Sequence, residues 1–310
     1  MLGFIWAFSQ EATLIEMAKE NPDIVVLTQD LGPIAAFNEQ FPERFFDMGI
    51  SEANLIGTAA GLAHAGKLPY VFAMAPFVSM RAFEQIRDDC AYNPNNVKII
   101  APCAGLEVSH WGATHHAVED MGLLRMIPGM TVISPADPGE ATRAVKAAAG
   151  IPGPVYIRMG YIQPIEGYDE PFEAGRAVCL KPGKDATILA TGACVSQALA
   201  AHEQLQEQGV HAGVQNIHTI KPIDRDAIIK AVDETWHIIT VEEHFINGGL
   251  GSAAAEIIAE TGRGRLLRLG LKDKFVTEVA PYPEVLSIVG LDAGSISRAV
   301  ISMIGNGNLN

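Results

Sequence analysis

The feature that most constrains the fold is an alternation of short apolar runs with longer stretches of helical pattern. The stretches with helical spacing lie near residues 9–20, 52–65, 79–93, 117–126 and 138–148. The runs of strand length between them are Ile24–Leu27, Leu68–Ala73, Val97–Ala101, Met130–Ser134 and Val155–Arg158. Strands that are apolar on both faces and separated by helices are typical of a parallel sheet covered by helices. The sequence therefore predicts an α/β fold.

The alternation breaks between residues 161 and 183, where prolines and glycines are frequent and no periodicity is strong. It resumes with strand-like runs and with helical stretches near residues 194–208 and 224–233; the runs are Ala186–Ala190, Val210–Val214 and His237–Val241. We therefore expect a first domain over residues 1–165, a linker over 166–183 and a smaller α/β domain over 184–310.

Composition excludes several classes of partner. The chain has 310 residues, a net charge of −14 and a hydrophobic content of 48%. Such a length is enough for two well-cored domains. A strongly acidic protein is a poor match for nucleic acid or for an anionic membrane surface, so neither is expected as a partner.

Cysteine usage and the N-terminal segment bear on the cellular compartment. Cys90, Cys103, Cys179 and Cys194 show neither CxxC spacing nor a metal-ligand pattern, which indicates a reduced protein. The apolar N-terminal segment lacks a basic region before it, and no apolar run reaches the length of a membrane span. We expect a cytoplasmic protein.

One acidic residue stands at the start of a long apolar helix. Glu52 follows Ser51, a candidate N-cap, and precedes a run of small and apolar residues. A carboxylate beside such a segment is costly to ionise. Taken alone, a first-turn glutamate most often complements the helix dipole, so this position needs support from elsewhere in the chain.

A glycine-rich turn follows the strand at residues 237–241. The sequence Val241–Ser252 ends a strand, passes through Gly248, Gly249 and Gly251, and enters a helix of small residues. It matches neither GxGxxG in a first βαβ unit nor GxxxxGK[ST]. A tight turn that allows close helix packing is favoured over a phosphate-binding loop.

Taken together, the motifs in this chain resemble the C-terminal half of the transketolase family. Order and spacing agree over nearly the whole chain, at Gly49–Glu52, Arg81–Arg87, Gly112–His116, Ile127–Asp137 and Val241–His244 with the glycines that follow. The resemblance implies two three-layer domains with mostly parallel sheets, a pyrimidine-binding domain and the family's C-terminal domain. Deoxyxylulose-phosphate synthase and the beta subunits of 2-oxo acid dehydrogenases contain the same pair of domains.

A part of the family pattern is missing. The family binds thiamine diphosphate and a divalent metal, Mg²⁺ or Ca²⁺, through a Gly-Asp-Gly segment followed by an Asn, and no Gly-Asp-Gly occurs in this sequence. The resemblance therefore implies one subunit of a split transketolase, with no metal ligands in this chain. The partner is an N-terminal transketolase subunit that carries the diphosphate and most metal contacts, in an assembly of two copies of each half.

The resemblance also assigns roles to individual residues. Glu52 hydrogen-bonds the N1′ atom of the aminopyrimidine and thereby activates the cofactor, Phe77 stacks on the pyrimidine ring, and Ile50 and Asp30 are further cofactor contacts. For Phe77, ordinary core packing stays an alternative. His115 matches a catalytic histidine of the substrate channel, where an imidazole can hydrogen-bond a hydroxyl or an oxyanion.

Three further positions concern the substrate. Arg158 lies where transketolases hold a substrate phosphate, although a strand-end arginine can equally brace an acidic loop residue. Trp111 stands where the family has an aspartate that binds a sugar hydroxyl, and Cys103 stands where the family has a further histidine near the phosphate end of the channel. A buried indole N–H only donates, so it cannot replace a carboxylate acceptor. A small sugar other than the ordinary pentose phosphates, branched or less phosphorylated, fits better.

The sequence thus predicts a transferase subunit that moves a two-carbon ketol unit from a ketose to an aldose. One alternative is the beta subunit of a 2-oxo acid dehydrogenase, or an enzyme like deoxyxylulose-phosphate synthase. His115 and Arg158 favour the transketolase. A non-catalytic scaffold is the other alternative, and Glu52 argues against it, because a scaffold has no need of a buried acid.

Overall fold

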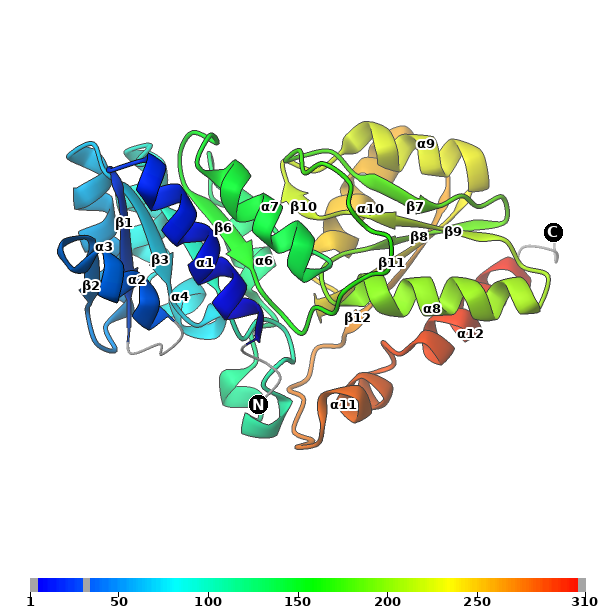
Figure 1. Cartoon of the computed structure of the whole chain (residues 1–310). Helices are drawn as coiled ribbons and strands as arrows, with labels where there is room; N and C mark the ends of the chain where they lie inside the picture. The colour runs from blue at the N-terminus through cyan, green and yellow to red at the C-terminus, as the bar shows by residue number, and fades with distance from the viewer. Residues whose placement is uncertain (1–4, 30–33, 306–310) are drawn as a thin grey trace.

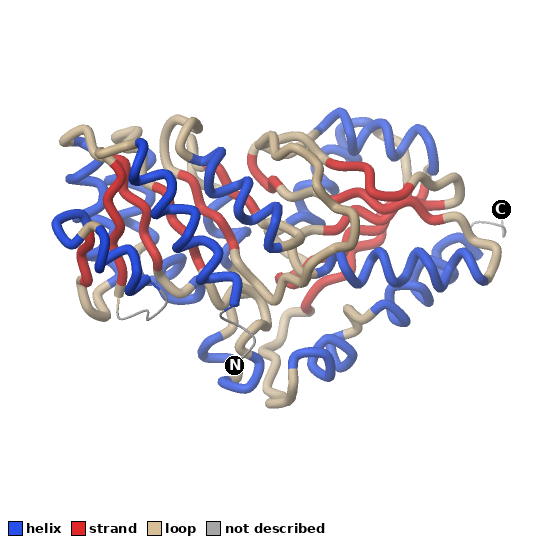
Figure 2. Tube along the Cα trace, in the orientation of Figure 1, coloured by secondary structure: helices blue, strands red, loops and turns tan. Residues whose placement is uncertain are grey.

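The computed structural model describes residues 5–29 and 34–305, with side chains from Gln10 onward. Two α/β units lie side by side, the N-terminal one on the left of Figure 1 and the C-terminal one on the right. In each unit a sheet lies between helices on its two faces (Figure 2). The predicted α/β class with two mostly parallel sheets is confirmed.

The first sheet has the strand order β10-β5-β6-β4-β3-β1-β2 over the described residues. All neighbours in it are parallel except β10, which is antiparallel to β5. Its strands are β1 (Ile24–Thr28), β2 (Phe45–Asp47), β3 (Leu68–Phe72), β4 (Lys98–Ala101), β5 (Thr131–Ile133), β6 (Val155–Arg158) and β10 (Thr219–Lys221). The accompanying helices are α1 (Ile5–Glu20), α2 (Ala35–Gln40), η2 (Pro42–Arg44), α3 (Glu52–His64), α4 (Ala75–Arg81), α5 (Phe83–Gln85), η3 (Ile86–Tyr92), η4 (Ser109–Trp111), η5 (Ala113–His115), α6 (Asp120–Arg125) and α7 (Pro138–Ala148).

Successive residues of the central strands point to opposite faces of the sheet, and each face packs against its own set of helices. The sheet with helices on both faces gives three layers. Val26 and Tyr70 pack with residues of α1 and α7. Val25 and Val71 pack with residues of α3 and η3 on the opposite face. Because both faces of each strand are buried, the strands read as continuous apolar runs in the sequence.

The second sheet has the order β12-β11-β8-β9-β7 over the described residues, and only β7 is antiparallel to its neighbour. Apolar residues of α8 and α12 cover one face, and those of α9 and α10 cover the other. The strands are β7 (Val178–Lys181), β8 (Ala186–Ala190), β9 (Ala212–Asn216), β11 (His237–Phe245) and β12 (Arg265–Leu271). The helices are α8 (Cys194–Glu207), α9 (Arg225–Thr235), α10 (Leu250–Thr261), α11 (Tyr282–Val289) and α12 (Ala293–Gly305).

Two strands depart from the expected domain boundaries. The expected linker, residues 166–183, contains β7, which pairs with β9 at the edge of the second sheet. Strand β10 lies beyond the expected start of the second domain, yet it pairs with β5 of the first sheet. Edge strands of three or four residues carry little periodic signal, so sequence reasoning missed both.

The helix expected over residues 79–93 is interrupted. Helix α4 ends at Arg81, α5 follows, and η3 is a stretch of π-helix from Ile86 to Tyr92. Such breaks often occur at functional sites. This one places Arg81 at the C-terminal end of a short helix.

One described segment, Tyr282–Gly305, is long and apolar enough to span a membrane by length and composition alone. This corrects the expectation that no run reaches that length. The segment consists of α11 and α12, separated by Gly290 in a left-handed conformation. Helix α12 packs on α8, where Ser297 Oγ donates to the Ala201 carbonyl oxygen at 3.3 Å.

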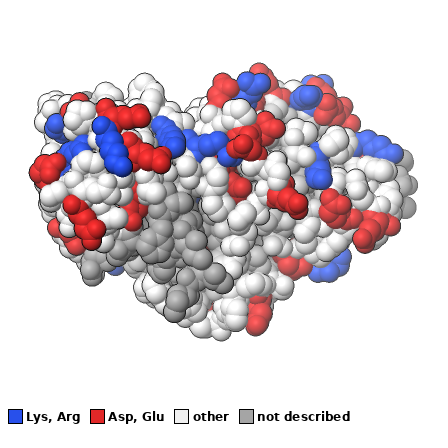
Figure 3. All heavy atoms as spheres, viewed as in Figure 1, with Lys and Arg blue, Asp and Glu red and all other residues white. Residues whose placement is uncertain are grey.

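The charge distribution agrees with the acidic composition. On the face shown in Figure 3, Lys and Arg side chains lie among Asp and Glu side chains and form no continuous basic area over the residues drawn in colour.

Candidate active site

The predicted site residues lie in segments that follow the carboxyl ends of parallel strands. Glu52 follows β2, Phe77 follows β3, and Cys103, Trp111 and His115 follow β4. In open α/β sheets, ligands bind at this edge, because the loops that leave it converge there. Asp30 would follow β1, but it lies outside the described residues.

Glu52 is the first residue of α3 and is 4% exposed. Its Oε1 atom accepts a hydrogen bond from Arg81 Nη1 at 2.9 Å, which is also an ion pair. Ser51 is the N-cap by position, but its hydroxyl donates to the Met48 carbonyl oxygen at 2.9 Å and does not cap the helix. The expected side-chain cap is therefore wrong, and the buried acid is real.

Three rings form a cluster that Arg81, which lies over the Phe77 ring, connects to this acid. The Phe77 and His115 rings meet edge to face with centroids 5.4 Å apart, and the His115 and Trp111 rings do so at 5.2 Å. Thr114 Oγ1 and His115 Nδ1 are 2.9 Å apart and share a hydrogen bond. The structure thus brings together three of the residues that the resemblance singled out.

Two of the predicted residues are open to solvent, and for Trp111 this was not expected. Trp111 is 45% exposed, so the assumption of a buried indole is wrong for the chain by itself. Ile50, two positions before Glu52, is 73% exposed. Large apolar side chains exposed beside a candidate site are typical of surfaces that a ligand or partner covers.

Cys103 does not join the ring cluster. Its side chain is 2% exposed, and it is one of two non-glycine residues with positive φ, at 61°, among those described. Its backbone N–H donates to Glu107 Oε2 at 3.0 Å. Burial and the nearby Glu107 carboxylate raise the pKa of the Cys103 thiol, which keeps it neutral. Its role in substrate binding stays a prediction.

Arg158 lies inside the protein, at the end of β6, and is 2% exposed. Its Nε atom donates to Asp120 Oδ2 at 2.9 Å, and its Nη2 atom donates to the carbonyl oxygens of Ala117 and Glu243 at 3.0 and 2.9 Å. The guanidinium is therefore committed to protein acceptors in both units. These contacts support the bracing alternative, and phosphate binding by Arg158 stays a prediction.

Glu243 is a second buried acid, and sequence reasoning gave it no role. Its carboxylate accepts from the Leu106 backbone N–H and from the Tyr282 hydroxyl, the latter at 3.0 Å. Burial raises the pKa of Glu243 to about 7, although Arg158 opposes the shift. A Cβ at Gly105 would come within 2.6 Å of this carboxyl group, so glycine is required there. Glu243 thus fixes the loop that leads to His115.

Glu242 settles the nature of the glycine-rich turn. Its two carboxylate oxygens accept from the backbone N–H groups of Leu250 and Gly251, both at 2.7 Å, at the start of α10. A Cβ at Gly249 would lie 2.0 Å from Glu242 Oε2. The donors that a phosphate would need already bind a carboxylate, so the structural interpretation of the turn is supported.

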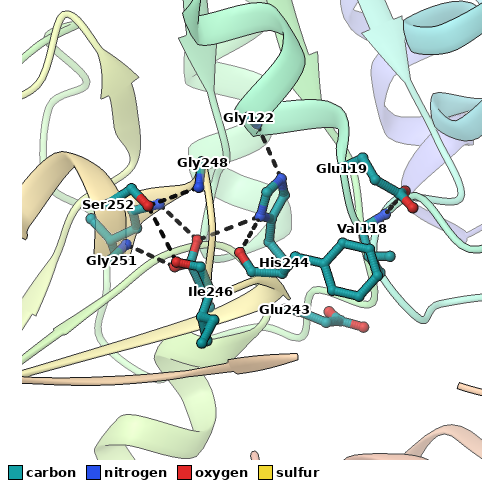
Figure 4. Close-up of polar contacts among 12 residues, drawn as sticks. Val118, Glu119, Gly122, Glu243, His244, Ile246, Gly248, Gly251 and Ser252 are labelled. Carbon is teal, nitrogen blue, oxygen red and sulfur yellow. Dashed lines mark hydrogen bonds and ion pairs between the residues drawn. The ribbon is translucent and has the colours of Figure 1, made fainter. Parts of the chain in front are cut away.

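His244 joins the two units from the same strand. Its Nε2 atom accepts from the Gly122 N–H at 3.0 Å, and its Nδ1 atom lies 2.6 Å from the Phe245 carbonyl oxygen (Figure 4). The imidazole is therefore a neutral tautomer with its proton on Nδ1. Burial lowers the pKa of His244, which agrees with that assignment.

The residues at Glu52 fit the aminopyrimidine of thiamine diphosphate. A flat, nitrogen-bearing group, the Arg81 guanidinium, already bonds the Glu52 carboxylate and lies 4.3 Å from the Phe77 ring centroid. For metal, the described residues contain no group of three or more His, Cys, Asp or Glu side chains that could hold an ion.

The fold is that of a two-domain α/β protein, and a family model matches each domain. The family model "Transketolase, pyrimidine binding domain" matches residues 5–161, and "Transketolase, C-terminal domain" matches residues 175–296. The chain belongs to the transketolase family, as a transketolase-type subunit.

Two curated relatives are similar over almost their whole length. The 6-deoxy-6-sulfo-D-fructose transketolase subunit SqwH of Clostridium sp. (strain MSTE9) is 39% identical, over 92% of this chain and 90% of the relative. An apulose-4-phosphate transketolase subunit of Phocaeicola vulgatus is 37% identical, over 94% of this chain and 95% of the relative.

A solved structure has the same architecture. It is described as "Split gene transketolase, inactive beta4 tetramer", and it superposes with a TM-score of 0.89 at 40% identity. The match covers 97% of this chain and 98% of that one.

Proposed function

We propose that this chain is the C-terminal subunit of a thiamine-diphosphate-dependent transketolase that transfers a two-carbon ketol unit from a ketose to an aldose. The observation that carries the proposal is the buried carboxylate of Glu52, which Arg81 connects to the Phe77 ring, itself in contact with His115. The family of the chain implies the cofactor. When bound, thiamine diphosphate supplies a nucleophilic carbon and stores an electron pair during the transfer.

The chain's own residues would orient the cofactor and the substrate. Glu52 holds a hydrogen bond to the pyrimidine, and its burial excludes water from that contact. Phe77 supports the face of the pyrimidine ring. His115 hydrogen-bonds a substrate hydroxyl or the oxygen on which charge develops, and the Glu243 contact to Leu106 holds its loop in place.

The proposed assembly contains two copies of this chain and two copies of a subunit with the diphosphate-binding domain. That partner would hold Mg²⁺ or Ca²⁺. Three observations support a separate partner subunit. The sequence has no Gly-Asp-Gly segment, and the described residues have no group of side chains that could hold a metal ion. Similar proteins are named as subunits. The solved relative described as a beta4 tetramer is also described as inactive. We place the complex in the cytoplasm.

For the substrate, we propose a ketose other than the ordinary pentose phosphates. Trp111 brings an exposed indole to the ring cluster where the family has a carboxylate. The names of two relatives, for a sulfonated fructose and for apulose 4-phosphate, give examples of such substrates in similar subunits. A deoxyxylulose-phosphate synthase-like or dehydrogenase-type reaction is the second candidate, because those enzymes contain the same two domains.

The test uses the chain alone and the complex with a Gly-Asp-Gly-containing partner. The chain alone should bind thiamine diphosphate and magnesium poorly in calorimetry, and micromolar binding without a partner would contradict the split arrangement. In the complex, Glu52→Gln should slow deuterium exchange at the thiazolium C2 atom about a hundredfold to ten-thousandfold. Glu84→Gln, an exposed glutamate on α5, is the matched control. Exchange close to that of the wild type would leave Glu52 with only a helix-terminus role.

A further inference from the structure

Arg81 occupies the space between the two residues expected to hold the pyrimidine. Its Nη1 atom is 2.9 Å from Glu52 Oε1, and its guanidinium carbon lies 4.3 Å from the centroid of the Phe77 ring. Among the described residues, Arg81 is the one side chain that pairs with the Glu52 carboxylate. Sequence reasoning used Arg81 only as part of a motif, and its spacing of four residues from Phe77 on α4 could have placed the two side by side.

These contacts are of the kind that an aminopyrimidine needs. A guanidinium is flat, carries N–H donors in its plane and stacks on aromatic faces. An aminopyrimidine is also flat and offers nitrogen to a carboxylate at its edge and a π-face to an aromatic ring. Both groups cannot use the same carboxylate oxygen and the same face of Phe77 together.

Of Glu52, Phe77 and Arg81, Arg81 is the residue whose side chain can move out of the site. Its side chain is 53% exposed, whereas the Glu52 side chain is 4% exposed. It stands at the end of α4, directly before the break at Ala82. A long side chain at a helix end can swing into solvent without moving the backbone, whereas Glu52 is fixed in the first turn of α3.

We propose that Arg81 holds the place of the aminopyrimidine in the cofactor-free chain, and that it must leave before the cofactor can bind. The inference rests on the proposed function, since it assumes that the cofactor's pyrimidine binds at Glu52 and Phe77. Arg81 gives the Glu52 carboxylate a counter-charge while the cofactor is absent. It is thus a gate at the cofactor site and does not contact the substrate.

The gate predicts the direction in which the affinity for the cofactor changes when the Arg81 contacts are removed. Because the ion pair and the ring contact must be broken on binding, their removal should strengthen cofactor binding. An ion pair with one exposed partner and an exposed cation–π contact together correspond to roughly a threefold to tenfold change in affinity. A residue that merely supported the site would change the affinity in the opposite direction.

Two measurements test the gate. The first is a double-mutant cycle of Glu52→Gln and Arg81→Ala, with urea unfolding of the chain alone, which reports whether the pair couples without cofactor. The second is the Kd and association rate of thiamine diphosphate for the complex with its partner and Mg²⁺. Arg87→Ala is the matched control, because Arg87 is 61% exposed and pairs with the neighbouring Asp88. Arg81→Lys serves if the alanine variant does not fold.

We expect a non-zero coupling in the chain alone, a Kd for the Arg81→Ala complex that is roughly threefold to tenfold lower, and an unchanged Kd for Arg87→Ala. With Arg81→Lys, which keeps the charge but loses the flat group, a smaller gain is expected. Zero coupling, or a Kd that is equal to or above that of the wild type, overturns the gate. If the wild-type complex binds no thiamine diphosphate, the proposed function fails and the gate fails with it, whatever the coupling.

Discussion

Replacing Arg158 by methionine should destabilise the protein severely, because Arg158 braces the two units. A variant that only lost a substrate contact would keep its stability. Methionine keeps much of the apolar volume but removes every donor, so the Asp120 carboxylate, 1% exposed, loses its ion pair at 2.9 Å. The carbonyl oxygens of Ala117 and Glu243 also lose the hydrogen bond from Arg158, although the Ala117 oxygen keeps the one from the Gly105 N–H. Removing one partner of a buried ion pair typically costs about 3–5 kcal/mol. We expect a loss of that size in the free energy of unfolding.

Urea unfolding followed by circular dichroism measures this loss. The control is Arg176→Met, since Arg176 pairs with Glu173 on the surface at 73% and 67% exposure and should change stability by less than about 0.5 kcal/mol. Adding Asp120→Asn to the Arg158→Met variant should recover part of the loss, because it removes the unpaired charge. A folded Arg158→Met variant of nearly normal stability, with a raised KM only for phosphorylated substrates, would refute the bracing role.

Three further predictions concern other buried or exposed positions. Burial raises the pKa of Glu243 from 4.5 to about 7, so the folded chain keeps a proton that the unfolded chain loses, and stability should fall by about 3 kcal/mol as pH rises between these values. Burial also raises the pKa of Glu242 to about 7, so Glu243→Gln should remove only the Glu243 share of the slope in urea titrations at about pH 5 and pH 8, and an unchanged slope would contradict the assignment. Glu242→Ala should cost about 1–3 kcal/mol of unfolding free energy, because the N–H groups of Leu250 and Gly251 lose their acceptor, and a near-zero loss would count against it. Trp111→Asp should leave stability within about 0.5 kcal/mol and raise kcat/KM for xylulose 5-phosphate about tenfold or more; full activity of the wild type on that substrate would contradict the substrate proposal.

Much of the fold could be predicted from the sequence because its strands are buried on both faces. Val155–Arg158 is a strand with the predicted bounds, and the helix over 138–148 also has its predicted bounds, with Asp137 as the N-cap whose side chain accepts from the Glu140 N–H. Such signals are local, since an apolar run or a capping residue acts within a few positions. Strands β7 and β10 were missed because their stability comes from pairing with distant strands.

The features of the site also fall into those that the sequence determines and those that only the tertiary structure decides. The sequence by itself determined the family, the α/β class and the presence of an acid at the start of α3, because residue types and their spacing suffice for these. Only the tertiary structure decided which partners the charged side chains take. Arg158 faces Asp120 and the carbonyl of Glu243, and Arg81 faces Glu52, 29 positions away in the chain. A charge buried by folding must find its partner among whatever groups the fold brings near, and no local pattern specifies that choice.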